Sequence, residues 1–339
     1  MRWPTKTLGG LLVDPLVGPR PGRVVIEDDV IAAVEDDPDE PTERLIFPGF
    51  VDLQVYEPAG IAATGVTGYL QAGQEPVSTG DPLCLGLHLE GPFVNPEFAG
   101  ALPVEALRPV DLDLLSGWLA QGNVRLVTIS PELEDARRAI RAIVRAGAVA
   151  GVGHTNANCT TVRAAVDAGA RFATHIWNAM APLRARSTGP IPELLVDERV
   201  TVGLIADGRH LHPRVEELTV RFAGPSRIAL TSDLVAKPMR DDYSLGGGDR
   251  AGAALVARMA RYGLAAAAEM ASLVPARLLG LADRGRLLPG QRADLAILDQ
   301  AYNPLETFVA GKLDWAVRYP QTEELDEIPP STGAPGTGA

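Results

Sequence analysis

Residues 124–154 read VRLVTISPELEDARRAIRAIVRAGAVAGVGH, and this stretch decides the fold class. Two short apolar runs, VRLVTIS and AVAGVGH, enclose EDARRAIRAIVRAGA, in which apolar residues recur at helical spacing up to Gly147. The pattern predicts a strand, an amphipathic helix and a second strand. Because the runs are continuously apolar rather than alternating, we expect the strands to be parallel and buried on both faces.

Six further apolar runs extend this pattern in both directions. They are FVDLQV, VTGYLQA and LCLGLHLE before residue 124, and RFATH, TVGLIA and RIALTSD after residue 154. Together the eight runs predict an α/β fold, a (β/α)₈ barrel of the TIM type, which a chain of 339 residues is long enough to close. The segments 56–65 and 73–82 are rich in Gly and Pro and short for a crossover, so one or two outer helices are expected to be missing there.

The two ends of the chain differ from this middle part in composition and pattern. Residues 1–47 and 286–318 contain short β-like pieces separated by Gly, Pro and Asp, which predicts a small β domain built from both termini beside a barrel at 48–285. Residues 319–339 are rich in Pro, Gly and acidic residues and contain little that could be buried. This composition predicts a disordered tail.

Charge and cysteine usage exclude several classes of protein. The net charge is −12 and no dense run of Lys or Arg occurs, so nucleic-acid binding is not expected. Cys84 and Cys159 lack a Cys-x-x-Cys spacing, which argues against a disulfide framework or a zinc finger and favours a reducing, cytoplasmic setting. No apolar run approaches the roughly 18 residues of a membrane span, so no membrane association is expected.

Four polar residues end four different predicted strands: Glu90, His154, His175 and Asp233. The carboxyl ends of barrel strands are where barrel enzymes build their active sites, so these side chains are expected to meet at one rim. Two imidazoles and a carboxylate supply three ligands to a metal ion, and a catalytic zinc keeps a further position for water or substrate. The sequence therefore predicts a metal-dependent hydrolase.

Five short motifs occur in order along the chain. They are PGFVD at 48–52, HLEGP at 88–92, GHTNA at 153–157, THIWNAM at 174–180 and IADGRH at 205–210. From about Pro48 to Ile297 the chain resembles the amidohydrolase superfamily and, within it, the N-acetylglucosamine-6-phosphate deacetylase family. The resemblance implies hydrolysis of the N-acetyl group of that sugar phosphate, giving glucosamine 6-phosphate and acetate.

The resemblance also assigns roles at the rim. It implies that Glu90, His154 and His175 are the metal ligands, the same three that strand placement selects. Asp233 matches the acid/base of the family, which takes a proton from the attacking water and returns it to the leaving amine.

The substrate phosphate is expected to bind at four positions that match the family: Asn178, Ala179, Arg186 and His210. In the family the Arg and the His reach in from a neighbouring subunit. The resemblance therefore implies a homodimer that acts on an amino-sugar phosphate.

Many amidohydrolases carry His-x-His at the end of the first strand and hold two metal ions. Here these positions are Gln54 and Tyr56, so we predict one divalent ion, with Gln54 beside it and near the substrate. Zinc is the expected ion, with iron and others as alternatives for such a ligand set. His88 lies on the same strand face as Glu90 and is predicted to support the ligands, the alternative being packing inside the barrel.

One position departs from the family pattern. Where the family ends a loop in Lys-x-Gly-Ala-His, this chain has Phe98 to Leu102, and Leu102 cannot donate a hydrogen bond to the substrate. Two alternatives therefore stay open. One is an amidohydrolase acting on another N-acyl sugar or a cyclic amide, and the other is a non-catalytic barrel that binds metal or sugar.

Overall fold

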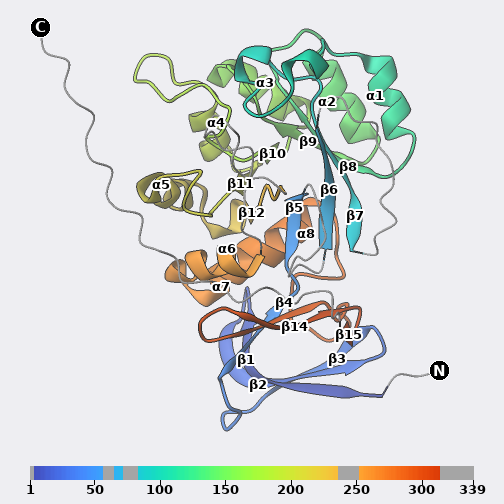
Figure 1. Ribbon diagram of the computed structural model, residues 1–339, viewed down its shortest axis with the longest axis vertical. Helices are drawn as coiled ribbons and strands as arrows, with labels where there is room; N and C mark the ends of the chain where they lie inside the picture. The colour runs from blue at the N-terminus through green and yellow to red at the C-terminus, as the bar shows by residue number, and fades with distance from the viewer. Residues whose placement is uncertain (1–3, 56–64, 72–82, 236–251, 314–339) are drawn as a thin grey trace, which may run out of the picture.

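The computed structural model describes residues 4–55, 65–71, 83–235 and 252–313. Within these residues the strands form two sheets, one of eight strands and one of seven (Figure 1). Tyr56, the predicted tail at 319–339 and almost all of the two segments predicted to lack outer helices lie outside the described residues.

The eight-stranded sheet confirms all eight predicted barrel strands. They are β5 (Val51–Val55), β6 (Gly65–Gln71), β7 (Cys84–Glu90), β8 (Val124–Ile129), β9 (Val149–Val152), β10 (Phe172–Ala173), β11 (Thr201–Leu204) and β12 (Ile228–Leu230). Each strand pairs in parallel with the next along the chain. A parallel bridge from Leu234, just beyond β12, to Val55 of β5 joins the last strand to the first. The predicted α/β barrel is therefore confirmed.

Helices fill the crossovers between β7 and β12. They are α1 (Leu112–Leu119), α2 (Ala136–Arg145), α3 (Cys159–Ala168), α4 (Ile191–Val196) and α5 (Pro213–Ala223), with 3-10 turns at Pro96–Phe98, Val104–Ala106 and Pro225–Arg227. The helix predicted within 134–148 is α2, which buries Ile140 and Ile143 on one face. Gly147, at φ +80°, follows the end of α2 and allows the turn into β9.

A second group of helices follows β12 and connects the barrel to the terminal sheet. It comprises α6 (Gly252–Met259), a 3-10 turn (Ala260–Tyr262), α7 (Leu264–Ala268), a π-helical turn (Glu269–Leu273) and α8 (Val274–Leu278). Helix α8 packs on β5 and β12, and α7 packs on the terminal strands β1 and β2. The hydroxyl of Ser272 donates to the carbonyl of Pro48 at 3.0 Å, where the chain enters the barrel.

Strands from both ends of the chain make the second sheet, as predicted. Its members are β1 (Lys6–Asp14), β2 (Gly18–Glu27), β3 (Val30–Asp36), β4 (Arg44–Pro48), β13 (Leu295–Asp299), β14 (Pro304–Val309) and β15 (Lys312–Leu313). The order is β15-β14-β13-β4-β1-β2-β3, so the C-terminal strands add to the edge of β4. Asp14, fully buried at the end of β1, accepts hydrogen bonds from Arg286 and from the backbone of Leu287. The domain boundaries themselves stay a prediction.

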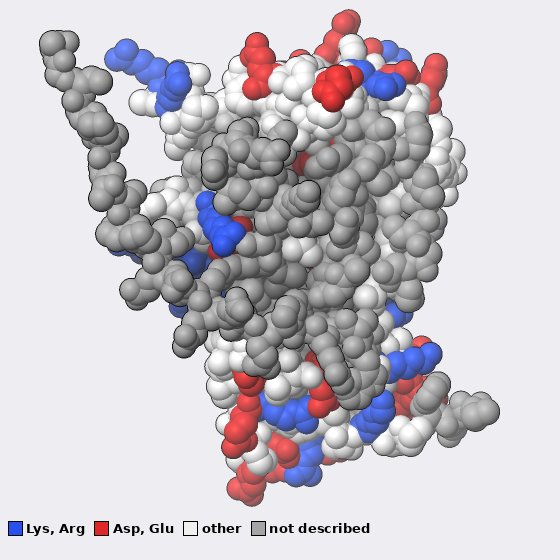
Figure 2. Space-filling view, in the orientation of Figure 1, with Lys and Arg blue, Asp and Glu red and all other residues white. Residues whose placement is uncertain are grey.

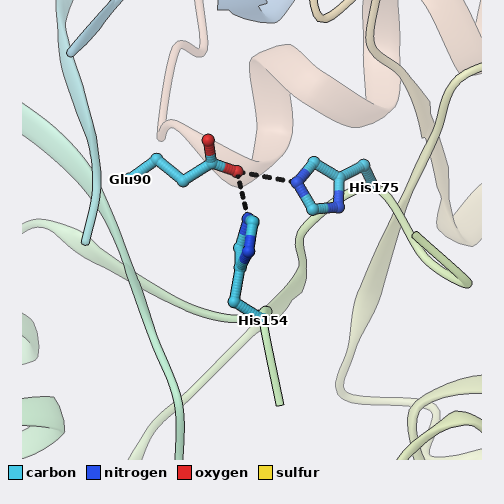
Figure 3. Close-up of side chains that lie close together, drawn as sticks. All are labelled: Glu90, His154 and His175. Atoms are coloured by element: carbon cyan, nitrogen blue, oxygen red, sulfur yellow. Dashed lines mark hydrogen bonds and ion pairs between the residues drawn. The ribbon is translucent and has the colours of Figure 1, made fainter. Parts of the chain in front are cut away.

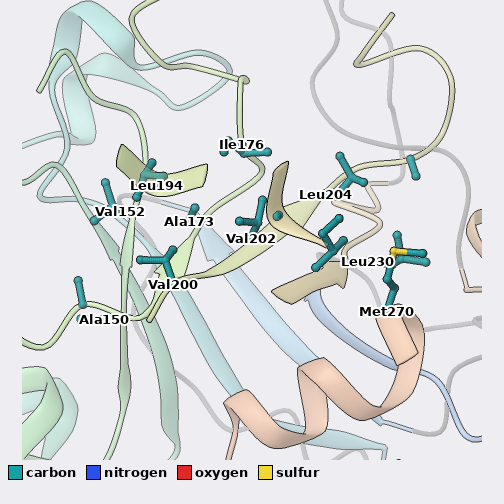
Figure 4. Close-up of a cluster of buried hydrophobic side chains, with 14 of the residues drawn as sticks. Ala150, Val152, Ala173, Ile176, Leu194, Val200, Val202, Leu204, Leu230 and Met270 are labelled. Atoms are coloured by element: carbon teal, nitrogen blue, oxygen red, sulfur yellow. The ribbon is translucent and has the colours of Figure 1, made fainter. Parts of the chain in front are cut away.

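Buried apolar side chains hold the carboxyl half of the barrel together. Figure 4 shows ten of them: Ala150, Val152, Ala173, Ile176, Leu194, Val200, Val202, Leu204, Leu230 and Met270. Most come from the four successive strands β9 to β12, from α4 or from the π-helical turn, while Ile176 follows β10 and Val200 precedes β11. Since burying a large aliphatic side chain contributes about 1.5–3 kcal/mol, this cluster fixes the strands whose ends carry the candidate site.

On the face drawn in Figure 2, acidic and basic side chains are interspersed over the terminal sheet at the bottom of the view. None of the helices that the structure describes has the length and apolar character needed to cross a bilayer.

Candidate metal centre

Glu90, His154 and His175 meet at the carboxyl rim of the barrel. Oε1 of Glu90 lies 2.9 Å from Nε2 of His154 and 2.7 Å from Nε2 of His175 (Figure 3). All three side chains are buried, and the two imidazole rings stand edge to face with centroids 5.0 Å apart. The structure thus brings together the three residues predicted to share an ion.

The backbone is strained where these side chains emerge. His154 follows β9 at φ +49°, His175 follows β10 at φ +27°, and Asp233 follows β12 at φ +50°. Non-glycine residues in this region cost roughly 1–3 kcal/mol each and occur where surrounding structure enforces them, often at functional sites. The end of each strand is therefore turned so that its side chain points into the barrel mouth.

The tautomer of His154 follows from its other ring nitrogen. Nδ1 lies 2.9 Å from the carbonyl oxygen of Phe98, which can only accept, so Nδ1 carries a proton. In the neutral ring Nε2 then presents a lone pair toward the carboxylate of Glu90. A cation bound at this point, a proton or a metal ion, would be shared by Nε2 of His154 and the carboxylate of Glu90.

Electrostatics at the centre favour bound positive charge. Burial raises the pKa of Glu90, but the neighbouring imidazoles outweigh burial and hold its pKa at about 2. Burial lowers the pKa of His175, but Glu90 outweighs this effect and raises the pKa of His175 to about 9. The carboxylate and its neighbours are therefore arranged to stabilise a proton or a metal ion between them.

Gln54 and Asp233 lie beside this group. The side-chain amide of Gln54 donates to Oδ1 of Asp233 at 2.7 Å and lies 3.3 Å from Oε1 of Glu90. Its own oxygen, Oε1, is buried with no hydrogen-bond partner among the described residues, as expected for an atom that faces an exchangeable ligand. Burial and the charge of Glu90 raise the pKa of Asp233 to about 6.

His88 lies deeper in the barrel, one layer below Glu90. Its Nδ1 donates to the carbonyl of Leu53 at 3.0 Å, so Nε2 accepts from the hydroxyl of Thr128 at 2.8 Å. Thr128 in turn lies 2.7 Å from the hydroxyl of Thr174, the residue before His175. Burial lowers the pKa of His88 to about 3, so the ring is neutral. Its role as a support for the metal ligands stays a prediction.

The THIWNAM and GHTNA loops pair with each other. The amide of Thr155 donates to the carbonyl of Ala179 at 3.1 Å, and Ala179 has φ +49°. The side chain of Asn178 donates to the carbonyl of His175 at 3.2 Å. Asn178 and Ala179 therefore lie next to the two candidate metal ligands His154 and His175, and their predicted contact with the substrate phosphate stays a prediction.

The other two predicted phosphate-binding residues follow different strands, His210 after β11 and Arg186 after β10. Nδ1 of His210 lies 2.8 Å from Oδ2 of Asp207, and His210 is near enough to Asp233 to lower its pKa. The predicted contact of His210 with a substrate phosphate in a neighbouring subunit stays a prediction. Arg186 is exposed on the loop between β10 and α4.

Glu132, which was not among the predicted site residues, holds the GHTNA loop in place through hydrogen bonds. Its carboxylate accepts from the hydroxyl of Thr155, the backbone of Asn156 and the side chain of Asn95. Glu132 lies two residues after the apolar run that ends at Ser130, and a carboxylate at the end of a barrel strand is the sequence feature that could have identified it. Leu102 is buried in a small apolar cluster with Val94 and Ala99.

The sequence matches a known protein family over most of its length. The model of the amidohydrolase family matches residues 62–319. The N-acetylglucosamine-6-phosphate deacetylase of Bacillus subtilis is 33% identical over 72% of this chain and 67% of the relative. The N-acetylgalactosamine-6-phosphate deacetylase of Escherichia coli O157:H7 is 32% identical over 85% of this chain and 93% of the relative.

A solved structure agrees over nearly the whole molecule. An aspartate-to-alanine mutant of N-acetyl-D-glucosamine-6-phosphate deacetylase from Mycobacterium smegmatis, in complex with N-acetyl-D-glucosamine-6-phosphate, superposes with a TM-score of 0.85 at 27% identity. The match covers 93% of this chain and 100% of that one. Family membership and the buried Glu/His/His group together indicate a metal site in a hydrolytic enzyme. The chain belongs to the amidohydrolase family and, within it, to the N-acetylglucosamine-6-phosphate deacetylases.

Proposed function

We propose that this enzyme hydrolyses the acetamido group of N-acetylglucosamine 6-phosphate and releases glucosamine 6-phosphate and acetate. The observation that carries the proposal is the approach of Nε2 of both His154 and His175 to Oε1 of Glu90, at 2.9 and 2.7 Å. The names of the relatives supply the substrate class.

We propose that Glu90, His154 and His175 hold one divalent ion, with zinc as the expected species. Two imidazoles and a carboxylate are a ligand set of catalytic zinc sites, and iron also accepts it. When bound, the ion polarises the amide carbonyl and lowers the pKa of a water molecule. Oε1 of Gln54, which has no hydrogen-bond partner in the part of the chain that the structure describes, supports an exchangeable ligand at this point.

Asp233 is proposed to move the proton. Its carboxylate takes a proton from the water that attacks the acetyl carbon, and it delivers this proton to the nitrogen as the carbon–nitrogen bond breaks. A pKa raised to about 6 by burial and by Glu90 suits both steps, because the group is charged at neutral pH and still basic. Gln54 orients the carboxylate through its hydrogen bond to Oδ1.

Binding of the phosphate is assigned to four residues: Asn178, Ala179, Arg186 and His210. The hydrogen bond from Nδ1 of His210 to Asp207 leaves Nε2 for an anionic ligand. Arg186 is exposed, as a residue that acts on a neighbouring subunit needs to be. We therefore propose a homodimer. We also propose a cytoplasmic setting, a barrel at 48–285 and a β domain at 1–47 plus 286–318, while the tail predicted at 319–339 lies outside the described residues.

A second candidate substrate is N-acetylgalactosamine 6-phosphate. The N-acetylgalactosamine-6-phosphate deacetylase of Escherichia coli O157:H7 aligns with this chain over 93% of its own length. Leu102 also supports a different sugar or acyl group, because its side chain is apolar and packs against Val94 and Ala99 rather than offering a hydrogen bond.

Acetate release tests the proposal directly. Metal-loaded protein is incubated with N-acetylglucosamine 6-phosphate, with N-acetylgalactosamine 6-phosphate and with unphosphorylated N-acetylglucosamine, and acetate is measured against the Asp233→Asn variant. We expect release from a phosphorylated sugar and at least 100-fold less from the variant, as is typical when a general acid/base is lost. Equal release by the wild type and the variant from every sugar would reject the proposal.

A further inference from the structure

Asp52 is a buried carboxylate in the middle of β5. Its side chain is 4% exposed, and the residues on either side of it in the strand, Val51 and Leu53, are apolar and buried. Burying a charged group is costly unless it is hydrogen-bonded, so a strand that serves only the core has no reason to carry one here. The hydrogen bonds of Asp52 show what it does instead.

The carboxylate joins the two strands that carry Gln54 and Asp233. Oδ1 of Asp52 accepts from the backbone amides of Gln54 and of Ser232, both at 3.1 Å, and Oδ2 lies 3.3 Å from the amide of Ser232. The hydroxyl of Ser232 donates to the carbonyl of Gln54 at 3.4 Å. Asp52 therefore fixes the backbone of Gln54 itself and of the residue before Asp233.

We infer that Asp52 is a positioning residue for the pair formed by Gln54 and Asp233. The Gln54 side chain reaches Oδ1 of Asp233 at 2.7 Å only while the ends of β5 and β12 keep their present spacing. Asp233 also has φ +50°, a conformation that the surrounding structure must enforce. Asp52 anchors the peptide before Asp233, and among the described residues it makes no hydrogen bond to Glu90, His154 or His175.

The consequence for activity rests on the proposed function, in which Asp233 is the acid/base. A misplacement of about 1 Å at a reacting group can cost about 10²-fold in rate. Loss of the Asp52 carboxylate should therefore lower kcat and leave KM nearly unchanged, because no substrate contact is removed.

The experiment compares Asp52→Ala and Asp52→Asn with Asp14→Asn. Asp14 is a matched control, because it is also buried and also accepts hydrogen bonds from two backbone amides, those of Leu16 and Val17. It lies in the terminal sheet, away from the candidate metal centre. Steady-state kinetics with the sugar phosphate, bound metal by elemental analysis and unfolding midpoints are measured for each. Asparagine keeps one acceptor oxygen and the side-chain volume, so Asp52→Asn remains informative should Asp52→Ala fail to fold.

We expect kcat to fall roughly 100-fold in Asp52→Ala and roughly 10-fold in Asp52→Asn, with KM within about 3-fold and the metal retained. Asp14→Asn should lose stability but keep kcat within about 2-fold of the wild type. A wild-type kcat in a folded, metal-loaded Asp52 variant, or an equal loss of kcat in Asp14→Asn, would overturn the inference.

Crystal structures provide a readout that does not depend on activity. In Asp52→Asn the distance between Nε2 of Gln54 and Oδ1 of Asp233 should lengthen from 2.7 Å to beyond hydrogen-bonding range. An unchanged distance would overturn the inference even if the wild type proved inactive on every sugar. Inactivity of the wild type with a lengthened distance in the variant would reject the proposed substrate alone.

Discussion

The side-chain amide of Gln54 donates to Oδ1 of Asp233 over 2.7 Å and so joins the first and last strands of the barrel across the metal centre. The same nitrogen lies 3.3 Å from Oε1 of Glu90. One neutral donor is thus placed between two buried carboxylates that would otherwise repel each other, and it holds the expected acid/base at a fixed distance from the metal ligands.

Replacement of this donor should slow the reaction. In Gln54→Ala we expect kcat to fall roughly 10- to 100-fold, because a hydrogen bond to a charged group is worth about 1.5–3 kcal/mol. Initial rates of acetate release measure the change. Gln121→Ala, at an exposed position after α1, is the control, and an equal effect of both variants would contradict the assigned role.

Removal of the metal should abolish activity and be reversible. A chelator should reduce acetate release at least 100-fold, and one added equivalent of a divalent ion should restore it. In Glu90→Gln the protein should retain less than a tenth of the ion, since the charged oxygen shared by both imidazoles is lost. Elemental analysis measures retention, with Glu97→Gln on the adjacent exposed turn as control. Full retention by Glu90→Gln would argue that the ion is held elsewhere.

His88 should stay neutral over the whole pH range in which the protein is folded. Its Nδ1 donates to the carbonyl of Leu53, and burial lowers its pKa to about 3. Nitrogen-15 NMR of labelled imidazoles should therefore report Nδ1 protonated and Nε2 bare, without titration between pH 5 and 8. A ring that titrates near pH 6.5, or one with the opposite tautomer, would be inconsistent with the described hydrogen bonds.

Asp52 should make stability fall as pH rises from acid to neutral. Burial raises its pKa in the folded protein to about 6 from 3.8, so between these values the folded state holds a proton that the unfolded chain has released. The stabilising contribution is complete below pH 3.8 and is lost as pH rises through 6. Relative to Asp52→Asn, the metal-free wild type should therefore gain about 1 kcal/mol on going from pH 7 to pH 5.

Urea unfolding of both metal-free proteins at these two pH values measures the difference. Asp14→Asn is again a useful comparison, because Arg286 and backbone amides lower the pKa of Asp14 despite its burial. In the wild type, the lowered pKa of Asp14 makes stability rise with pH. Asp14→Asn should lose this rise, which is the opposite of the change expected in Asp52→Asn. Parallel stability curves for the wild type and Asp52→Asn would contradict a raised pKa.

The periodicity of the sequence predicted the barrel, because each buried strand leaves a continuous apolar run such as residues 124–130. It also predicted that Glu90, His154 and His175 lie together, since the carboxyl ends of parallel strands share one rim. Both predictions use only local patterns and one rule of topology.

Other features depend on contacts between distant segments. The hydrogen bond from Nδ1 of His154 to the carbonyl of Phe98 sets the tautomer of the ring, and it needs a loop 56 positions away in the chain. The approach of Gln54 to Asp233 spans 179 positions and follows from barrel closure.

We propose that Glu90, His154 and His175 share a single ion. Anomalous diffraction from crystals of the zinc-loaded protein, collected on both sides of the zinc absorption edge, tests it most directly. We expect one strong peak at about 2.0–2.2 Å from a carboxylate oxygen of Glu90 and from Nε2 of both imidazoles. A peak that any one of these three side chains fails to reach, or no peak at the barrel rim, would contradict it.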